Sequence, residues 1–173
     1  SLVGSEMCIR DRKAAAAGKV IFGVCGGFQM LGDTLSDPLH VEAGGTIKGM
    51  GLLPMDTVFA GEKTRTRAEG AFGKTEGVLA GIEGTRIEGY EIHMGVTTPV
   101  EGAPDSPLNL LENGSTDGYY VDSTCMGTYI HGILDNPEFI DFLLAPFADK
   151  LSGNAGAFDY HTFKEEQYDR LAE

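Results

Sequence analysis

The sequence predicts an α/β fold, and three adjoining features carry that prediction. Residues 19–24 (KVIFGV) form a short run of apolar and β-branched residues, typical of a strand buried on both faces in a parallel sheet. A glycine-rich turn follows, and residues 28–36 then have helical spacing that ends at Asp37 and Pro38. A strand, a tight turn and a helix in immediate succession are typical of the start of an α/β unit.

The remaining elements are predicted from periodicity and from turn residues. Residues 12–17 are alanine-rich and read as the end of a helix, with Gly18 at its C-terminal cap. Residues 44–99 and 117–132 read as short strands separated by Gly, Pro, Asn and Asp turns. Asn136 and Pro137 then mark the N-cap and first position of an amphipathic helix. A charged helix is expected over residues 161–172.

Composition excludes several classes of function. The chain has 173 residues, 42% of them hydrophobic, which is enough for one core. Its net charge of −13 argues against nucleic acid or an anionic membrane as partner, since both require a basic face. No apolar run approaches the roughly 20 residues that cross a bilayer. Three irregularly spaced cysteines indicate neither a disulfide framework nor a zinc site, so we expect a cytoplasmic protein with no bound metal.

Two segments are distinguished by composition. Residues 1–11 (SLVGSEMCIRD) differ from the rest and lack the basic start and apolar block of a signal peptide. We expect this segment to be a translated sequencing-adaptor artefact or, as the alternative, a disordered tail. Residues 12–173 are expected to form a partial domain, cut at both ends.

Cys25 is the first candidate for chemistry, in GVCGGFQML. An apolar strand that ends in Gly-x-Cys-Gly-Gly and runs into a helix resembles a nucleophile elbow, whose crowded turn requires small neighbours; Gly23, Gly26 and Gly27 meet that need. The Gly26 N–H is expected to point toward an oxyanion formed at Cys25. Gln29, one helical turn on, is expected to face the same pocket. The alternative is a buried structural cysteine.

A base for Cys25 is sought among four histidines. His40 and His161 lie in polar segments and are expected at the surface, which leaves His93 and His131. His131 follows a predicted strand over residues 126–130, and active sites of open α/β sheets gather at the carboxyl ends of strands. We therefore predict a Cys25–His131 pair with sulfur and ring nitrogen about 4–5 Å apart. Cys125 is expected in the core.

Several motifs together resemble a known family. GVCGGFQML is similar to the G-x-C-x-G-x-Q motif of class I glutamine amidotransferases. GVCGGFQMLG, GMGLLPMDTVF, EKT, GYEIHMG, GTYIHGILDN and FKEEQYDRLA occur in this order in the glutamine amidotransferase domain of the cobyric acid synthase family. The resemblance runs from about residue 13 to the end. It implies a three-layer, flavodoxin-like class I amidotransferase fold, truncated at its N-terminus.

The resemblance also implies an activity and partners. Cys25 would be the nucleophile and His131 the general base that release ammonia from L-glutamine, with Gly26, Gly27 and Gln29 binding the oxyanion and substrate. A separate synthetase domain would use ATP and Mg²⁺ to activate carboxylates of adenosylcobyrinic acid a,c-diamide, giving the b, d, e and g amides. This chain has no G-x-x-x-x-G-K-[ST] phosphate-binding motif, so it is expected to hold no cofactor.

The sequence departs from the wider class at one position. Class I amidotransferases carry a glutamate two residues after the histidine. This chain has Ile133 at that position, and the cobyric acid synthase branch also lacks the glutamate. We expect Ile133 in the core and leave Asp135 and Glu91 as candidates to orient His131. His93 remains open between a substrate-side or interdomain contact and a structural role. The competing functions are an amidotransferase acting on lipid II or cobyrinate, and a noncatalytic α/β binding module.

Overall fold

The α/β fold class is confirmed by a computed structural model that describes residues 2–122 and 124–145. A three-stranded sheet has the order β1 (Ile21–Val24), β9 (Cys125–Thr128), β8 (Tyr119–Tyr120). The pair β1–β9 is parallel, and Val24 lies opposite Thr128. The strand predicted over residues 19–24 therefore has the expected direction, but in the described part of the chain it lies at a sheet edge, and most of its side chains are only half-buried.

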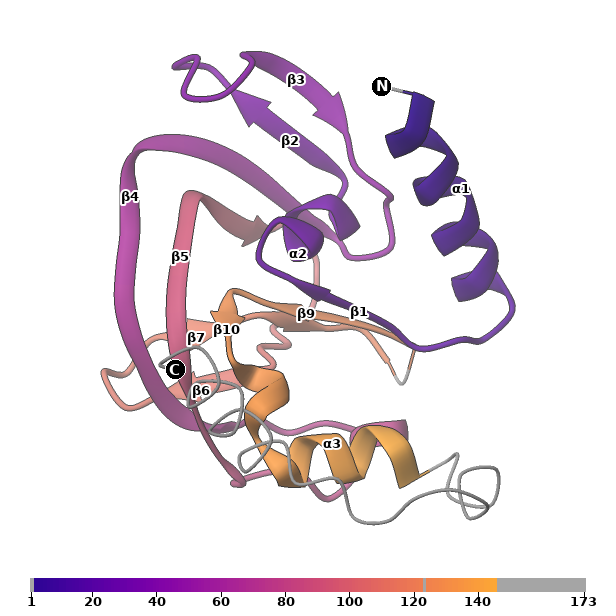
Figure 1. The fold of residues 1–173 in the computed structure, drawn as a ribbon, viewed down its shortest axis with the longest axis vertical. Coiled ribbons are helices and arrows are strands. Elements are labelled where there is room, and N and C mark those ends of the chain that lie inside the picture. Colours follow the sequence, from indigo (N-terminus) through magenta and orange to yellow (C-terminus); the bar gives the residue numbers. More distant parts are fainter. Residues whose placement is uncertain (1, 123, 146–173) are drawn as a thin grey trace, which may run out of the picture.

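A second, seven-stranded sheet is mostly antiparallel. The order along its main path is β10 (Ile130–His131), β5 (Arg86–Pro99), β4 (Met55–Phe72), β2 (Thr34–Asp37) and β3 (Gly45–Lys48). Off this path, β6 (Asn109–Leu111) pairs with β4, and β7 (Thr116–Asp117) pairs with β6. Strands β4 and β5 run side by side as long curved ribbons along one side of the molecule (Figure 1). Their length contradicts the expectation of short strands. Glycines that read as turns, such as Gly70 and Gly89, instead lie inside these strands, where Gly70 pairs with Ile87 and Gly89 with Ala68.

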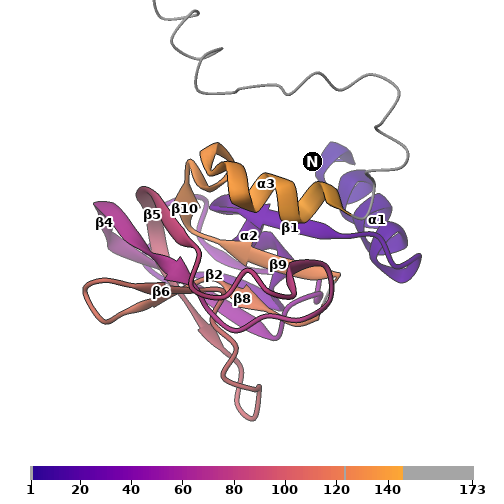
Figure 2. The ribbon, with the colours of Figure 1, turned by 90° about the horizontal axis from the view of Figure 1, so that it is seen from below.

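Three α-helices and two short 3-10 helices complete the described chain. They are α1 (Leu2–Ala16), α2 (Gly26–Leu31), η1 (Gly77–Leu79), η2 (Ile133–Asp135) and α3 (Pro137–Leu144). Figures 1 and 2 both show α1 on the side of the molecule away from β4 and β5. Arg12 ties α1 to the body, since its guanidinium donates to the carbonyls of Gly49 and Met50 at 2.9 and 2.8 Å. No helix in the described ranges is long and apolar enough to cross a membrane.

Two predicted helices differ from their expected form. The helix expected over residues 28–36 ends at Leu31, and residues 34–37 form β2, which pairs with both β3 and β4. Sheet pairing thus overrides the apolar spacing of this segment. At α3, Pro137 is the first residue as predicted, but the Asn136 side chain does not cap the helix; it bonds to the backbone of Glu88, Gly132 and Ile133.

The segment at the N-terminus is helical in the structure, as part of α1. Helix α1 ends at Ala16 and Gly18 has φ +70°, which confirms the predicted helix end and its glycine cap. The proposed origin of residues 1–11 stays a prediction. The helix expected over residues 161–172, which includes His161, lies outside the described residues.

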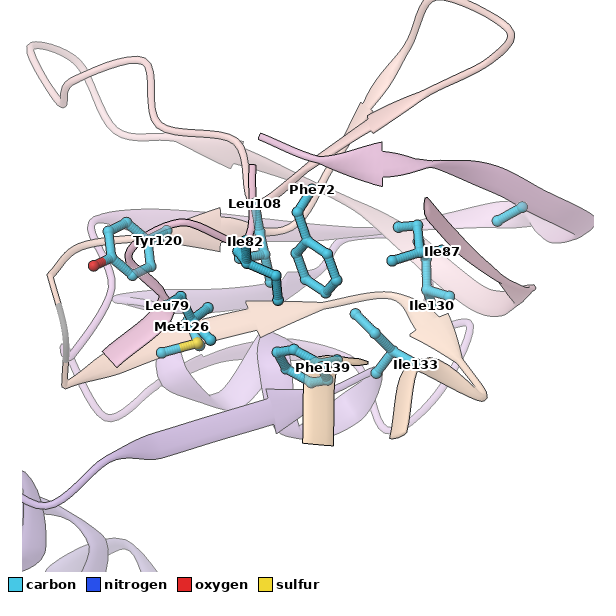
Figure 3. Close-up of a cluster of buried hydrophobic side chains, with 11 residues drawn as sticks. Phe72, Leu79, Ile82, Ile87, Leu108, Tyr120, Met126, Ile130, Ile133 and Phe139 are labelled. Carbon is cyan, nitrogen blue, oxygen red and sulfur yellow. The ribbon is translucent and has the colours of Figure 1, made fainter. Parts of the chain in front are cut away.

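The main core lies between the two sheets and α3 (Figure 3). Its buried residues come from both sheets, both 3-10 helices, α3 and the loops that carry Ile82 and Leu108: Ala68, Phe72, Leu79, Ile82, Ile87, Leu108, Tyr120, Met126, Ile130, Ile133 and Phe139. A second cluster packs α2 on β9, and Cys125 lies within it at 4% exposure, as predicted. Val24 packs against the main core and Phe28 lies in the second cluster, so the turn that carries Cys25 connects the two clusters.

Candidate active site

Cys25 occupies the turn between β1 and α2 in a conformation that few residues adopt. Its backbone has φ 53° and ψ −115°, and Cys25 is one of two non-glycine residues with positive φ among those described. Such strain at a strand-to-helix turn is what a nucleophile elbow requires, and it confirms the predicted shape of this turn. The Cys25 N–H donates to the Thr128 carbonyl at 2.9 Å, and its thiol donates to the Ile92 carbonyl at 3.4 Å.

The three glycines around Cys25 serve different purposes. A side chain at Gly23 would lie within 2.9 Å of Leu31, Phe28 and Gly27, so close packing of α2 requires glycine there, as predicted. Gly26 and Gly27 are exposed, and a Cβ at either would meet open space. The expectation that crowding requires these two glycines is therefore wrong. Their absent side chains leave room beside the Cys25 turn.

Gln29 lies one turn of α2 beyond Cys25, but its amide is directed inward. The side chain is buried, and Nε2 donates to the Met94 carbonyl at 3.0 Å and to the Tyr129 hydroxyl at 3.1 Å. Cys25 and Gln29 thus bond to carbonyls two residues apart on β5. The structure gives Gln29 a role in anchoring α2, whereas its binding of substrate stays a prediction.

His131 lies in β10, directly after the chain has left β9. The strand predicted over residues 126–130 is in fact two strands, so His131 belongs to the larger sheet, where it pairs with Tyr90. The Tyr90 ring stacks on the imidazole with centroids 5.2 Å apart and an interplanar angle of 5°. Both residues line a hollow of about 390 Å³ that also includes Val24 and Asp135. The His131 Nε2 atom is buried and has no hydrogen-bond partner among the described residues.

One segment of β5 contacts both catalytic candidates. The Ile92 carbonyl accepts the Cys25 thiol, and Tyr90, two residues earlier, pairs with His131 and stacks on its ring. Gly89 permits this pairing, because a Cβ there would lie 2.2 Å from the His131 carbonyl oxygen. The GYEIHMG motif therefore forms the surface on which the Cys25 turn and β10 meet. The distance from sulfur to imidazole stays a prediction.

His93 and Glu91 line a different pocket, of about 320 Å³, which also includes Asp117 and Tyr129. The His93 ring stacks on Tyr129 with centroids 3.7 Å apart, and its Nδ1 donates to the Gly95 carbonyl at 3.0 Å. Burial lowers the pKa of His93, against the opposing effect of that carbonyl. Burial raises the pKa of Glu91, and nearby Asp117 adds to the effect. These contacts suit a structural His93.

Ile133, Asp135 and His40 lie in three different environments. Ile133 is 1% exposed in the main core, as predicted. Asp135 lines the same hollow as His131, and its orienting role stays a prediction. His40 is exposed in the turn after β2, as expected.

Three residues near these candidates were assigned no role from the sequence. Tyr90 stacks on His131, and Tyr129 bonds to Gln29. Asp117 is a buried carboxylate that accepts hydrogen bonds from Asn109, Thr128 and the Tyr129 N–H. Asp117 precedes a glycine, and an Asp-Gly pair is typical of an exposed turn. The sequence therefore gave no indication that this carboxylate is buried.

Comparison with known proteins assigns the family. The model of the CobB/CobQ-like glutamine amidotransferase domain matches residues 6–139. The chain belongs to this family. Cobyric acid synthase of Bacteroides fragilis is 52% identical over 92% of this chain, which covers 30% of that relative. The cobyric acid synthases of Parabacteroides distasonis and Ruminiclostridium cellulolyticum are each 47% identical over 99% and 98% of the chain, covering 33% and 34% of the relatives.

The relatives in this family are much longer than this chain. The chain spans about a third of the length of the cobyric acid synthases that it matches. It is thus similar to the amidotransferase part of those proteins, and the mixed α/β architecture is consistent with a class I amidotransferase fold. Glutamine is the nitrogen donor that this family assignment implies.

Proposed function

We propose that this chain is the glutaminase domain of a cobyric acid synthase, in which Cys25 and His131 release ammonia from L-glutamine. The observation that carries the proposal is the backbone of Cys25, held at φ 53° and ψ −115° between a strand and a helix. A structural cysteine in a turn has no need of this conformation, which costs about 1–3 kcal/mol. The contacts of β5 with both Cys25 and β10 support the pairing with His131.

The proposed reaction has two halves. The Cys25 sulfur attacks the side-chain amide carbon of glutamine while His131 takes the thiol proton, and the resulting oxyanion lies against the Gly26 N–H. The C–N bond then breaks, His131 returns the proton to the leaving ammonia, and a glutamyl thioester remains on Cys25. Water, deprotonated by His131, attacks the thioester and releases glutamate and the free thiol. The open space beside Gly26 and Gly27 is where we place the substrate.

The ammonia is proposed to serve a synthetase domain in the longer protein, in the cytoplasm. That domain would bind ATP and Mg²⁺ and activate the b, d, e and g carboxylates of adenosylcobyrinic acid a,c-diamide. The support is the identity with cobyric acid synthases about three times as long as this chain.

The test replaces Cys25 with serine in the full-length protein that joins this domain to its synthetase domain. Cys25→Ser is expected to abolish glutamine-dependent amidation and to leave ammonia-dependent amidation intact, because only the ammonia source depends on the thiolate. Amidation of the corrinoid is measured with glutamine and then with ammonium chloride. Cys125→Ala, which removes a buried thiol outside the centre, is the control and is expected to retain both activities.

The alternatives predict other results. Loss of both activities in folded Cys25→Ser contradicts the proposed role of Cys25. Amidation of lipid II or cobyrinate in place of the a,c-diamide identifies a related amidotransferase. Failure of 6-diazo-5-oxonorleucine to alkylate Cys25 in the wild-type protein indicates a noncatalytic module.

A further inference from the structure

The chain changes sheets between the last residue of β9 and the first of β10. Thr128 ends the three-stranded sheet, Ile130 begins pairing with β5, and Tyr129 lies between them. We call residues 128–130 the crossover. A crossover between sheets interrupts the regular backbone ladder, so its N–H groups need other acceptors.

A buried carboxylate supplies these acceptors. Asp117 is 5% exposed, and its Oδ1 accepts the Tyr129 N–H at 2.8 Å. Its Oδ2 accepts the Thr128 hydroxyl and the Asn109 side-chain amide, the latter at 2.8 Å. The Thr128 hydroxyl oxygen in turn accepts the Ile130 N–H at 3.0 Å. Asp117 and the hydroxyl that it orients thus bind two successive N–H groups of the crossover.

The partners of Asp117 are suited to a charged carboxylate. Burial raises the pKa of Asp117, whereas all three groups that bond to it are donors and act in the opposite direction, favouring the ionised form. An asparagine in its place would direct an N–H₂ group toward donors. A neutral, isosteric replacement therefore disrupts the network without emptying the site.

The same crossover contacts the nucleophile. The Thr128 carbonyl accepts the Cys25 N–H at 2.9 Å, so the peptide next to the crossover holds the strained turn. At its other end the crossover leads directly into His131. A shift of the crossover would therefore move Cys25 and His131 relative to each other.

We propose that Asp117 is a positioning residue for the glutaminase reaction, whose carboxylate holds the Thr128–Tyr129–Ile130 crossover and thereby sets the separation of Cys25 and His131. This inference rests on the proposed function. Asp117 acts through Thr128 and Tyr129, whose hydroxyl and N–H it accepts, and not on the substrate itself.

The experiment compares variants of the network in the full-length protein. Asp117→Asn and Thr128→Val remove the carboxylate and the hydroxyl that it orients, whereas Thr128→Ser keeps a hydroxyl. Thr75→Val is the matched control, because the Thr75 hydroxyl also bonds inside the protein, at 2.8 Å to the Leu79 carbonyl, but outside the crossover. The measurements are glutaminase kcat and KM, the rate of alkylation of Cys25 by 6-diazo-5-oxonorleucine, and the thermal midpoint.

Asp117→Asn and Thr128→Val are expected to lower kcat and the alkylation rate on the order of tenfold to a hundredfold, as a misplaced catalytic pair does, with KM changed by about twofold or less. Thr128→Ser is expected to restore most of the rate, and Thr75→Val to leave it at the wild-type level. If Asp117→Asn does not fold, the comparison of Thr128→Val with Thr128→Ser decides whether the hydroxyl that Asp117 orients is needed for the rate.

Three outcomes would overturn the inference: unchanged kcat and alkylation in folded Asp117→Asn and Thr128→Val, equal losses in Thr128→Ser and Thr128→Val, or equal losses in Thr75→Val. Cys25→Ser is measured alongside. If Cys25→Ser keeps glutaminase activity, the proposed function fails; if it loses that activity while the network variants keep theirs, only the role of Asp117 fails.

Discussion

Residues in this centre gain their properties from where the backbone places them. Cys25 has an ordinary side chain, but the crowded contacts of Gly23 beneath α2 and the bond to Thr128 hold it in a conformation that favours glycine. The thiol then contacts the Ile92 carbonyl at the junction of both sheets. Strain that would be costly in a structural turn is here located at the proposed nucleophile.

Cys125 shows the opposite environment and gives a chemical test. It lies in the second core cluster, and burial raises its pKa from the ordinary 9.0 to about 12, with nearby Asp122 adding to the effect. At pH 8 its thiolate fraction is then on the order of 1 in 10⁴. In a Cys8→Ser background we expect iodoacetamide to label Cys25 and to spare Cys125, as measured by peptide mass spectrometry. Labelling of both cysteines is expected only after denaturation.

The same pKa predicts how pH changes stability. Above pH 9 the unfolded state loses the Cys125 proton while the folded state keeps it, so the free energy of unfolding falls as pH rises toward 12. The slope approaches about 1.4 kcal/mol per pH unit. The advantage of the wild type over Cys125→Ala in urea unfolding should shrink between pH 9 and 11. An advantage that does not change with pH, or early labelling in the native protein, would contradict the buried thiol.

Sequence reasoning succeeded at residues whose role is local and missed those whose role depends on distant strands. The strand–turn–helix pattern predicted the turn at Cys25, and an aliphatic Ile133 was expected in the core and lies there. The role of Asp117 depends on its hydrogen bonds with Asn109 and Thr128, which lie next to it only after β6, β7 and β9 have assembled. No periodicity in a single sequence encodes such a contact.

At the scale of elements, β5 packs against β10 with no room for a side chain between them. Its Gly89 faces β10 so closely that a Cβ would lie 2.2 Å from the His131 carbonyl oxygen and 2.5 Å from Ile130 Cγ2. The His131 carbonyl belongs to the backbone, which cannot move aside as easily as the end of a flexible side chain. The glycine that read as a turn is thus a point of close contact between two strands, which also explains why strand lengths were predicted wrongly.

Gly89→Ala is therefore expected to displace β10 and with it His131. We expect glutaminase kcat in the full-length protein to fall on the order of tenfold or more, and the free energy of unfolding to fall by about 1–3 kcal/mol. The control is Gly61→Ala in β4, where a new Cβ meets nothing within 4 Å. Steady-state glutaminase kinetics and urea unfolding of both variants provide the measurement. Wild-type kinetics in Gly89→Ala would show that β10 does not depend on this contact.

At the scale of the molecule, the two sheets had no separate signature in the sequence. The α/β class followed from the first strand, turn and helix, but β9 and β10 read as one strand because nothing in Met126–Ile130 marks the change of sheet. The change becomes necessary only when β5 is present to pair with β10. The division into two sheets, and with it the setting of His131, is a property of the assembled fold.

Phe139 of α3 joins these two sheets, and its removal tests whether they form one cooperative unit. It is 0% exposed, and its ring packs on Phe22 of β1 with centroids 5.3 Å apart. It also packs on Phe72 of β4, with centroids 5.0 Å apart (Figure 3). Phe139→Ala removes contacts to both sheets at once, so we expect a loss of about 3–5 kcal/mol in the free energy of unfolding.

The measurement is urea unfolding followed by tyrosine fluorescence and far-ultraviolet circular dichroism. The control is Leu110→Ala in β6, a large apolar residue that is 49% exposed, for which a loss of about 1 kcal/mol or less is expected. Because the core that contains Phe139 draws on β4, β5, β9 and β10 together, both probes should report one transition, shifted to lower urea in Phe139→Ala. Two separated transitions in Phe139→Ala, with one of them at the wild-type midpoint, would mean that one sheet remains folded without the other, and that α3 does not couple the sheet that leads into Cys25 to the sheet of His131.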